Sequence, residues 1–378
     1  MSVFVPNVSA ANSPHDGDRS SASAVLTSLE AAFDLAGRPR GRLFFSAPTQ
    51  FHARSTVYFV GDATEIDRGS QWVVKRPNEG AAQEDLDNPV GAEQQFEALR
   101  LLAAHFEPVA PLLRVPAPVA FLPDLPALAM EYVSGTGLDR LIGTRSLFQP
   151  KPLLEGIAMA GRFLRHLHAL DPAREELVRP RALADEILEL RDSVLHPAGL
   201  VLPAEAVEVL EALPDVEVRA RSVRLHGDFA PVNMILGARN CVSGIDPSLS
   251  GVGIPEEDLA RFLMMLATEQ RLFLISPEVK RVRAMRRRAE SVLLERYYGE
   301  AATSVLLELR LIQQLCRRWL RRHMARVARR PSLEALRSRA VDRYFSYLLC
   351  ERSRALTCAP YYRTFLPPVK NGSGGSTA

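Results

Sequence analysis

The sequence pattern changes at a Gly-Thr-Gly segment, residues 135–137. Before it, short β-branched or aromatic runs are separated by turn residues, which indicates strands, and one segment has apolar residues at helical spacing. The predicted strands are 42–47, 55–60, 71–77, 117–121 and 127–133, and the predicted helix is 92–106. After the glycines, long amphipathic segments predict helices. The order predicts an α+β fold with a small antiparallel-sheet lobe followed by a mainly helical lobe.

We expect four regions along the chain. Residues 1–30 begin with a Ser-, Ala- and Asn-rich stretch that predicts no fixed structure, and residues 367–378, with their NGSGGST run, predict a flexible tail. Residues 31–135 are the predicted sheet lobe and residues 136–366 the predicted helical lobe. A ligand cleft between two such lobes is the usual place for a site.

Composition excludes several classes of protein. The 378 residues are 47% apolar and 24% charged, which is typical of a folded protein with a large core. No run of about 18 apolar residues occurs, and no basic stretch followed by an apolar run opens the chain. The four cysteines are scattered without a CxxC pair. We therefore expect a cytoplasmic protein with no membrane span, disulfide framework or zinc site.

The most informative polar residues lie in RLHGDFAPVNMIL, residues 224–236, and in the segment that starts at VSGIDPSLSG, residues 242–251. Short apolar runs beside each polar stretch predict a small β insert, which would bring Asp228, Asn233 and Asp246 together at one end. Mg²⁺ prefers such oxygen ligands and commonly shares them with phosphate. Phosphoryl transfer needs metal ions to neutralise phosphate charge, and a group that aligns the attacking hydroxyl.

The segment HGDFAPVN resembles the HGDxxxxN catalytic loop of the aminoglycoside phosphotransferase and choline kinase family. SGID and the later DLA, residues 243–246 and 258–260, resemble the metal-binding strand and the helix after it. The resemblance implies a two-lobed, protein-kinase-like fold. It also implies an ATP- and Mg²⁺-dependent enzyme that phosphorylates a hydroxyl group of a small molecule.

The resemblance assigns roles to five residues. Asp228 is implied to be the catalytic aspartate that positions and deprotonates the acceptor hydroxyl, and Asn233 and Asp246 to hold Mg²⁺. His226 is expected to organise the loop by hydrogen bonding. Asp258, at a helix start, is expected to cap or tether the loop.

The nucleotide is expected to contact the sheet lobe. Lys75, in WVVKRP, resembles the strand lysine that contacts nucleotide phosphates, and Ser55 and Thr56 follow the turn where hydroxyl groups reach phosphate. Backbone groups from Glu131 to Val133 are implied to bind adenine. Gln95 occupies the helix position where the family usually has an acid, and it is expected to hold Lys75 by a neutral hydrogen bond.

Two alternatives remain open from sequence. Gln95 and the absence of a Gly-rich nucleotide loop favour a nucleotide-binding pseudokinase or scaffold. Residues 271–370 carry 23 Lys and Arg against 8 Asp and Glu, so anionic-polymer binding through Arg-rich helices is the second alternative. We do not expect nucleic acid as a partner, because apolar residues in these helices also form a core stripe. The acceptor is expected to be a sugar, nucleoside, amino alcohol or antibiotic-like molecule, and the basic C-terminal third favours an anionic or neutral one. The sequence leaves the oligomeric state open.

Overall fold

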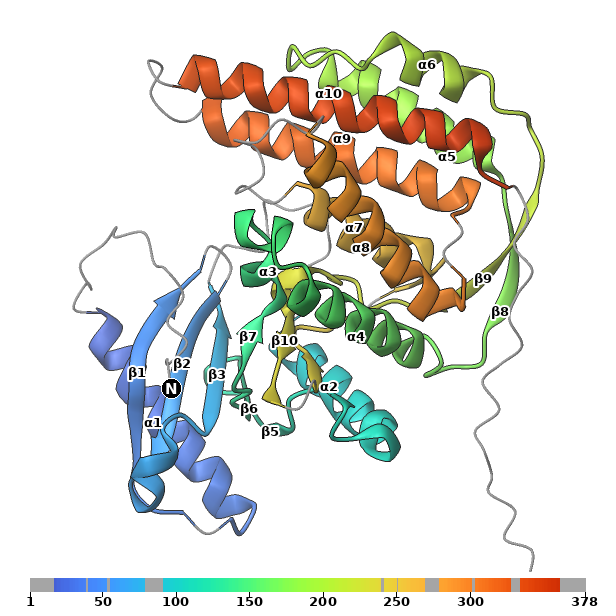
Figure 1. Cartoon of the computed structure of the whole chain (residues 1–378). Coiled ribbons are helices and arrows are strands. Elements are labelled where there is room, and N and C mark those ends of the chain that lie inside the picture. The colour runs from blue at the N-terminus through green and yellow to red at the C-terminus, as the bar shows by residue number, and fades with distance from the viewer. Residues whose placement is uncertain are drawn as a thin grey trace, which may run out of the picture. The chain divides into compact units, whose positions relative to one another are not determined.

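The computed structural model describes residues 17–38, 40–52, 55–78, 91–238, 241–249, 251–268, 279–300, 303–327 and 334–360. Contacts divide the chain into two units, and Figure 1 shows their elements. The first unit comprises residues 1–171 and 224–252, and the second comprises residues 172–223 and 253–378. The boundaries of the four regions predicted from sequence stay a prediction.

The first unit is built around a five-stranded antiparallel sheet in the order β1-β2-β3-β6-β5. Its strands are β1 (Leu43–Phe51), β2 (Ser55–Asp62), β3 (Trp72–Pro77), β5 (Pro118–Leu122) and β6 (Ala127–Glu131). Helix α2 (Ala92–Phe106) packs against β5 and β6 through its apolar stripe. These elements match the predicted strands and helix, because their apolar residues recur with the periods of two and of 3.6 that each structure requires.

A second, four-stranded sheet of this unit has the order β4-β11-β10-β7. It consists of β4 (Leu113–Arg114), β7 (Thr136–Gly137), β10 (Met234–Leu236) and β11 (Val242–Gly244). Strands β10 and β11 pair antiparallel and belong to the small β insert that the sequence predicts. Helices α3 (Leu138–Leu141) and α4 (Lys151–Leu167) also belong to the unit, and α4 packs on β11. This small sheet carries the polar segments singled out in the sequence.

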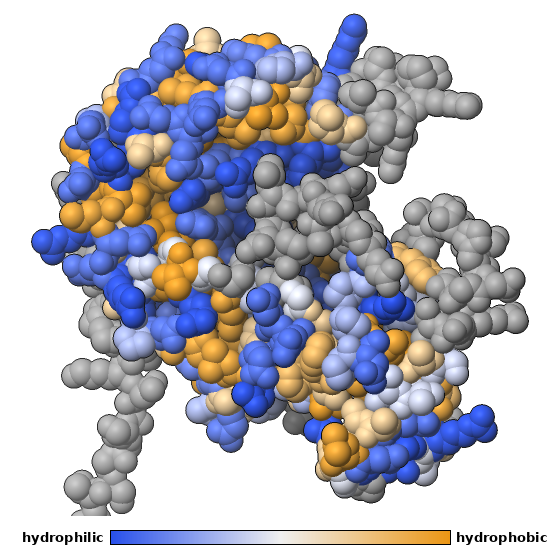
Figure 2. All heavy atoms as spheres, turned by 180° about the vertical axis from the view of Figure 1, so that it is seen from behind, coloured by the Kyte–Doolittle hydropathy of each residue, from blue (hydrophilic) through white to orange (hydrophobic). Residues whose placement is uncertain are grey.

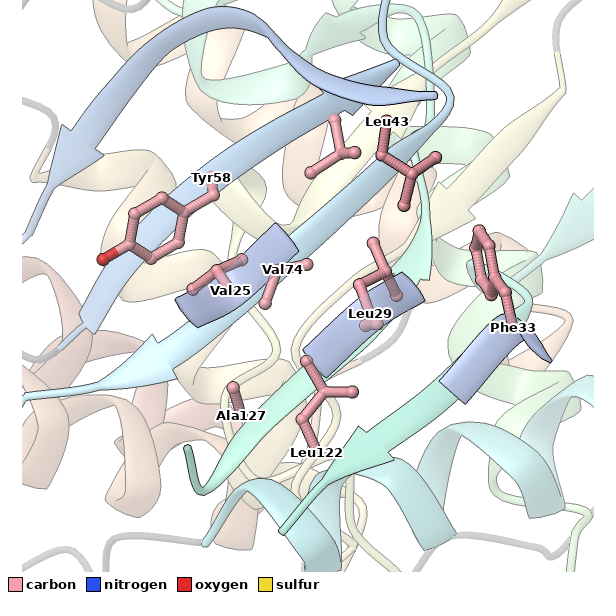
Figure 3. Close-up of a cluster of buried hydrophobic side chains, with 10 residues drawn as sticks. Val25, Leu29, Phe33, Leu43, Tyr58, Val74, Leu122 and Ala127 are labelled. Atoms are coloured by element: carbon pink, nitrogen blue, oxygen red, sulfur yellow. The ribbon is translucent and has the colours of Figure 1, made fainter. Parts of the chain in front are cut away.

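Helix α1 (Gly17–Leu35) covers part of the five-stranded sheet. Val25, Leu29 and Phe33 follow one another at four-residue spacing and are buried in a cluster with side chains of the sheet, as Figure 3 shows. The sequence analysis expected no fixed structure for residues 1–30, and residues 17–30 differ from that expectation. The Ser-, Ala- and Asn-rich composition at the start of this stretch indicated no fixed structure, but Val25, Leu29 and Phe33 on one face dock the helix on the sheet. The predicted flexible tail, 367–378, and residues 1–16 lie outside the described residues.

The second unit is mainly helical. Its helices are α5 (Pro180–Leu190), α6 (Ala204–Glu211), α7 (Glu256–Ala267), α8 (Lys280–Tyr298), α9 (Val305–Val327) and α10 (Glu334–Cys358). Helix α9 packs against α5, α7 and α10. A three-stranded sheet in the order β12-β9-β8 accompanies them, with β8 (Arg174–Val178), β9 (Val218–Arg224) and β12 (Val252–Gly253). The predicted α+β class is therefore confirmed. Among the described residues, no helix is long and apolar enough to cross a membrane.

Candidate active site

The loop between β9 and β10 brings Asp228 and Asn233 together. The Asn233 side-chain amide donates to the backbone oxygen of Asp228 at 2.8 Å and to its carboxylate Oδ2 at 3.1 Å. Gly227 has a φ of 83°, which is readily adopted by glycine and lets the chain turn before Asp228. Asn233 itself is buried, so its amide has a fixed position. The loop thus holds the Asp228 carboxylate beside the oxygen-bearing side chain of Asn233.

His226 is fully buried at the start of this loop. Its backbone oxygen accepts hydrogen bonds from the N–H and the hydroxyl of Ser248, at 2.9 and 3.1 Å. The N–H of Asp228 donates to the ring Nδ1 at 3.4 Å, and the ring lies beside Phe163 and Phe229. These contacts agree with the organising role predicted for His226, because they connect the loop to the segment after β11.

Asp246 follows β11 and meets the same loop. The backbone N–H of Ile245 donates to the backbone oxygen of Asn233 at 2.9 Å, which sets the two predicted metal residues on adjacent chain segments. Asp246 has a φ of 56°, a left-handed conformation that is uncommon for a residue other than glycine. Such strained conformations are concentrated at functional sites.

Lys75 of β3 forms an ion pair with Asp246, with 2.9 Å between Nζ and Oδ1. The two side chains are 15% and 30% exposed, so the pair is partly screened from water. Gln95, expected to hold Lys75, lies half-buried on α2. Within the described parts of the chain, no hydrogen bond joins Gln95 to Lys75. The partner of the lysine is therefore the predicted metal ligand, because this carboxylate offers a full charge.

These side chains fit a magnesium ion that is shared with phosphate. Asn233 and Asp246 supply an amide oxygen and a carboxylate, and Lys75 supplies a cation for phosphate oxygens. The described residues contain no cluster of three or more His, Cys, Asp and Glu side chains that could hold a metal. Mg²⁺ commonly takes one or two protein carboxylates and completes its coordination with phosphate and water.

The predicted phosphate-binding hydroxyls belong to the first two residues of β2, which follow the predicted turn after β1. Ser55 is buried, and the hydroxyl of Thr56 donates to the side-chain oxygen of Asn78 at 3.0 Å. Asn78 in turn donates from its amide to the backbone oxygen of His52 at 2.8 Å. Asn78 therefore braces both sides of the turn. Asn78 is not among the residues that the sequence singles out, although its position directly after the strand that carries Lys75 was a usable signal.

The predicted adenine-binding segment lies at the end of β6. The N–H groups of Glu131 and Tyr132 donate to Ala117 and Gln71, both at 2.8 Å. The N–H of Val133 makes no hydrogen bond among the residues that the structure describes.

Asp258 lies in the first turn of α7 and is buried. It belongs to the second unit, whereas Lys75, Asp228, Asn233 and Asp246 all belong to the first. An acid at the first turn of a helix is favoured by the helix dipole, which agrees with the structural role expected for Asp258.

Comparison with known proteins identifies the family of the chain. Residues 50–298 match the model of the phosphotransferase enzyme family (APH). No curated protein matches the chain.

Several solved structures are similar. A glucosamine kinase in complex with glucosamine, ADP and inorganic phosphate has 16% identity and a TM-score of 0.53, and the match covers 86% of each chain. A putative aminoglycoside phosphotransferase from Ralstonia eutropha JMP134 has 15% identity and a TM-score of 0.52, over 87% of this chain and 98% of the other. A choline/ethanolamine kinase family protein from Mesorhizobium loti has 16% identity and a TM-score of 0.48, over 90% and 95% of the two chains. The first two likenesses show a common fold.

Proposed function

Because the chain belongs to the phosphotransferase enzyme family, we propose that it transfers the γ-phosphoryl group of ATP to a hydroxyl group of a small molecule. The predicted family, the kinase-like fold and the small-molecule kinase class are confirmed by the family match and the similar folds. The assignment of ATP, Mg²⁺ and the individual residues is our proposal. The observation that carries it is that the Asp228–Asn233 hydrogen bond and the Lys75–Asp246 ion pair lie within one unit, on segments joined by the backbone hydrogen bond from Ile245 to Asn233.

In this proposal Asp228 accepts the proton of the acceptor hydroxyl. The hydroxyl oxygen forms a bond to the γ-phosphorus while the bond from phosphorus to the ADP oxygen breaks, and ADP leaves with the electron pair. Lys75 binds phosphate oxygens, and Asn233 and Asp246 hold Mg²⁺, which supplies charge neutralisation. The N–H of Val133 binds the adenine base. Positioning and electrostatic stabilisation provide most of the rate in such transfers.

The acceptor is proposed to be a neutral or anionic polyol, such as a sugar or nucleoside, or an amino alcohol. A protein of the same fold holds glucosamine together with ADP, which supports including amino sugars in the test panel. The excess of arginine over acidic residues in the C-terminal third favours neutral and anionic acceptors over polycationic ones.

The test is ADP formation from ATP and Mg²⁺ with a panel of sugars, amino sugars, nucleosides, amino alcohols and aminoglycosides, with the product identified by its mass. We expect at least one class to stimulate ADP formation in the wild type. Asp228→Asn should lower kcat by about 10²–10⁴-fold, the usual contribution of a positioned base, and keep the ADP affinity. Asp124→Asn changes an exposed aspartate in the same unit and should match the wild type.

Two results would contradict the proposal. If Asp228→Asn retains wild-type turnover, the catalytic assignment is wrong. If the wild type binds Mg²⁺ and ATP but transfers phosphate to no member of the panel, the pseudokinase alternative replaces the enzyme.

A further inference from the structure

Arg114 joins the two sheets of the first unit. It lies on β4 of the four-stranded sheet, where it is the parallel neighbour of Ser243 on β11. Its Nε donates to the hydroxyl of Ser243 at 3.2 Å, and its Nη1 donates to the carboxylate of Glu131, on β6 of the five-stranded sheet, at 2.9 Å. One guanidinium group therefore holds a strand end in each sheet.

Both partners of Arg114 lie next to residues of the proposed nucleotide site. Glu131 precedes Val133 by two residues, and its second carboxylate oxygen accepts the N–H of Ala117 at 3.2 Å. Ser243 is buried and precedes Asp246 by three residues on the strand that leads to it. The two hydrogen bonds of Arg114 thus connect the backbone segment proposed to bind adenine with the strand that leads to the proposed metal ligand Asp246.

We propose that Arg114 is a positioning residue that fixes the metal-binding strand relative to the adenine-binding strand. This inference rests on the proposed function. The planar guanidinium donates from two edges in a fixed geometry. A lysine side chain carries a single ammonium group, which cannot donate to Glu131 and Ser243 in the same arrangement. Arg114 touches neither nucleotide nor metal in the proposed site, and it acts only through Glu131 and Ser243.

A second contact between the two sheets explains why the Arg114 hydrogen bonds are needed in addition. The Lys75–Asp246 ion pair also runs from the five-stranded sheet to the segment after β11. In the proposed complex Lys75 turns to phosphate and Asp246 to Mg²⁺, so this direct pair is replaced by ligand contacts. The hydrogen bonds from Arg114 to Glu131 and Ser243 involve neither residue, so they persist. They keep Asp246 at the right distance from the nucleotide when the direct pair opens.

The test measures ADP binding by calorimetry, once with EDTA and once with saturating Mg²⁺. The ratio of the two dissociation constants is the Mg²⁺ enhancement. Arg114→Lys and Ser243→Ala each remove the bond to the metal-binding strand. We expect each to lower the Mg²⁺ enhancement by about tenfold, the effect of one lost hydrogen bond to a charged group, while Ser243→Ala keeps the affinity measured with EDTA.

The double variant tests whether the two residues act through one bond. If they do, Arg114→Lys with Ser243→Ala should match Arg114→Lys alone, since coupled effects are not additive. Arg100→Lys is the control, because Arg100 is exposed and pairs with Glu97 on its own helix. Thermal unfolding of each variant separates positioning from stability.

Each outcome decides between the two proposals. A Mg²⁺ enhancement that stays at the wild-type value in both single variants overturns the role of Arg114, and so does additivity in the double variant. A lower unfolding midpoint with an unchanged enhancement assigns Arg114 a purely structural role and also overturns the inference. If the wild type binds no ADP in either condition, the proposed function itself fails and the inference falls with it.

Discussion

Among single residues, Asp62 is a buried carboxylate that accepts several hydrogen bonds at the end of a strand. It ends β2 and is 5% exposed. It accepts hydrogen bonds from the backbone N–H groups of Gly41 and Thr64, at 2.7 and 2.8 Å, and from the Thr64 hydroxyl at 2.7 Å. Burial acts to raise the pKa of Asp62, but these hydrogen bonds outweigh it and hold the pKa below the ordinary value of 3.8. The ionised form therefore stabilises the folded state.

The stability that Asp62 contributes should depend on pH. Because its pKa is lower in the folded protein than in the unfolded chain, this contribution is complete above about pH 4 and is lost as the pH falls through the folded-state pKa. Asp62→Asn should lower the free energy of unfolding at pH 7 by about 1–3 kcal/mol, and the loss should shrink in acid. Urea unfolding at pH 7 and pH 3 measures both values, with Asp124→Asn as the exposed control. A loss that is equal at the two pH values would contradict this assignment.

The sequence predicts which residues form the candidate site better than it predicts which of them contact one another. Asp228 and Asn233 lie five residues apart, so a local motif specifies their proximity. The partner of Lys75 is 171 positions away, and tertiary folding alone decides whether Asp246 or Gln95 reaches it. Arg114 was missed for the same reason, since its contact with Ser243 spans 129 positions and no local pattern marks it.

Among the elements, α1 also depends on tertiary contacts that a local sequence pattern does not reveal. The strands of the five-stranded sheet and α2 carry apolar residues at periods of two and 3.6 and were predicted correctly, whereas α1 follows a Ser-, Ala- and Asn-rich stretch and gains its stability by docking on the sheet. The family model begins at residue 50, so α1 lies outside the matched part. The stability that α1 contributes therefore has to be measured on this protein.

The docking of α1 predicts a clear contrast between two leucines of the same helix. Leu29 is fully buried in the cluster of Figure 3, and Leu35 is 92% exposed. Leu29→Ala should lower the free energy of unfolding by about 2–5 kcal/mol, because it removes buried methyl groups and leaves a cavity. Leu35→Ala should leave it unchanged. Urea denaturation provides the comparison, and equal effects of the two substitutions would mean that α1 does not dock in solution.

At the scale of the whole molecule, several arginines of the C-terminal third form ion pairs with acids of the second unit. Arg286 pairs with Glu351, Arg310 pairs with Glu257 at 3.1 Å, and Arg352 pairs with Glu290 at 2.5 Å. Side chains committed in this way are not available to the phosphates of a polymer. The face shown in Figure 2 has hydrophilic residues interspersed with hydrophobic ones. The basic composition of these helices is thus partly explained by internal ion pairs, which composition alone does not reveal.

The buried arginine Arg352 makes two unequal contacts, and these support a last prediction. It donates to both carboxylate oxygens of Glu290, at 2.7 and 2.5 Å, and more weakly to Glu308 at 3.5 Å. Burial acts to raise the pKa of Glu290, but Arg352 outweighs it and lowers that pKa. Burial raises the pKa of Glu308, with Arg352 only partly opposing it. Ionised Glu290 therefore stabilises the fold at neutral pH, whereas ionised Glu308 carries a desolvation cost that grows as the pH rises above the ordinary glutamate pKa of 4.5.

Replacing each acid by its neutral amide should separate the two contacts. Glu290→Gln leaves the charge of Arg352 without its main partner in a buried place, and should lower the free energy of unfolding at pH 7 by about 3–5 kcal/mol. Glu308→Gln keeps an acceptor for Arg352 and removes the cost of burying a second negative charge, so its effect should be clearly smaller. Urea unfolding of both variants at pH 7 gives the order. An equal or larger loss from Glu308→Gln would show that Arg352 depends on both carboxylates, because a guanidinium buried between two necessary acids is destabilised alike by the loss of either.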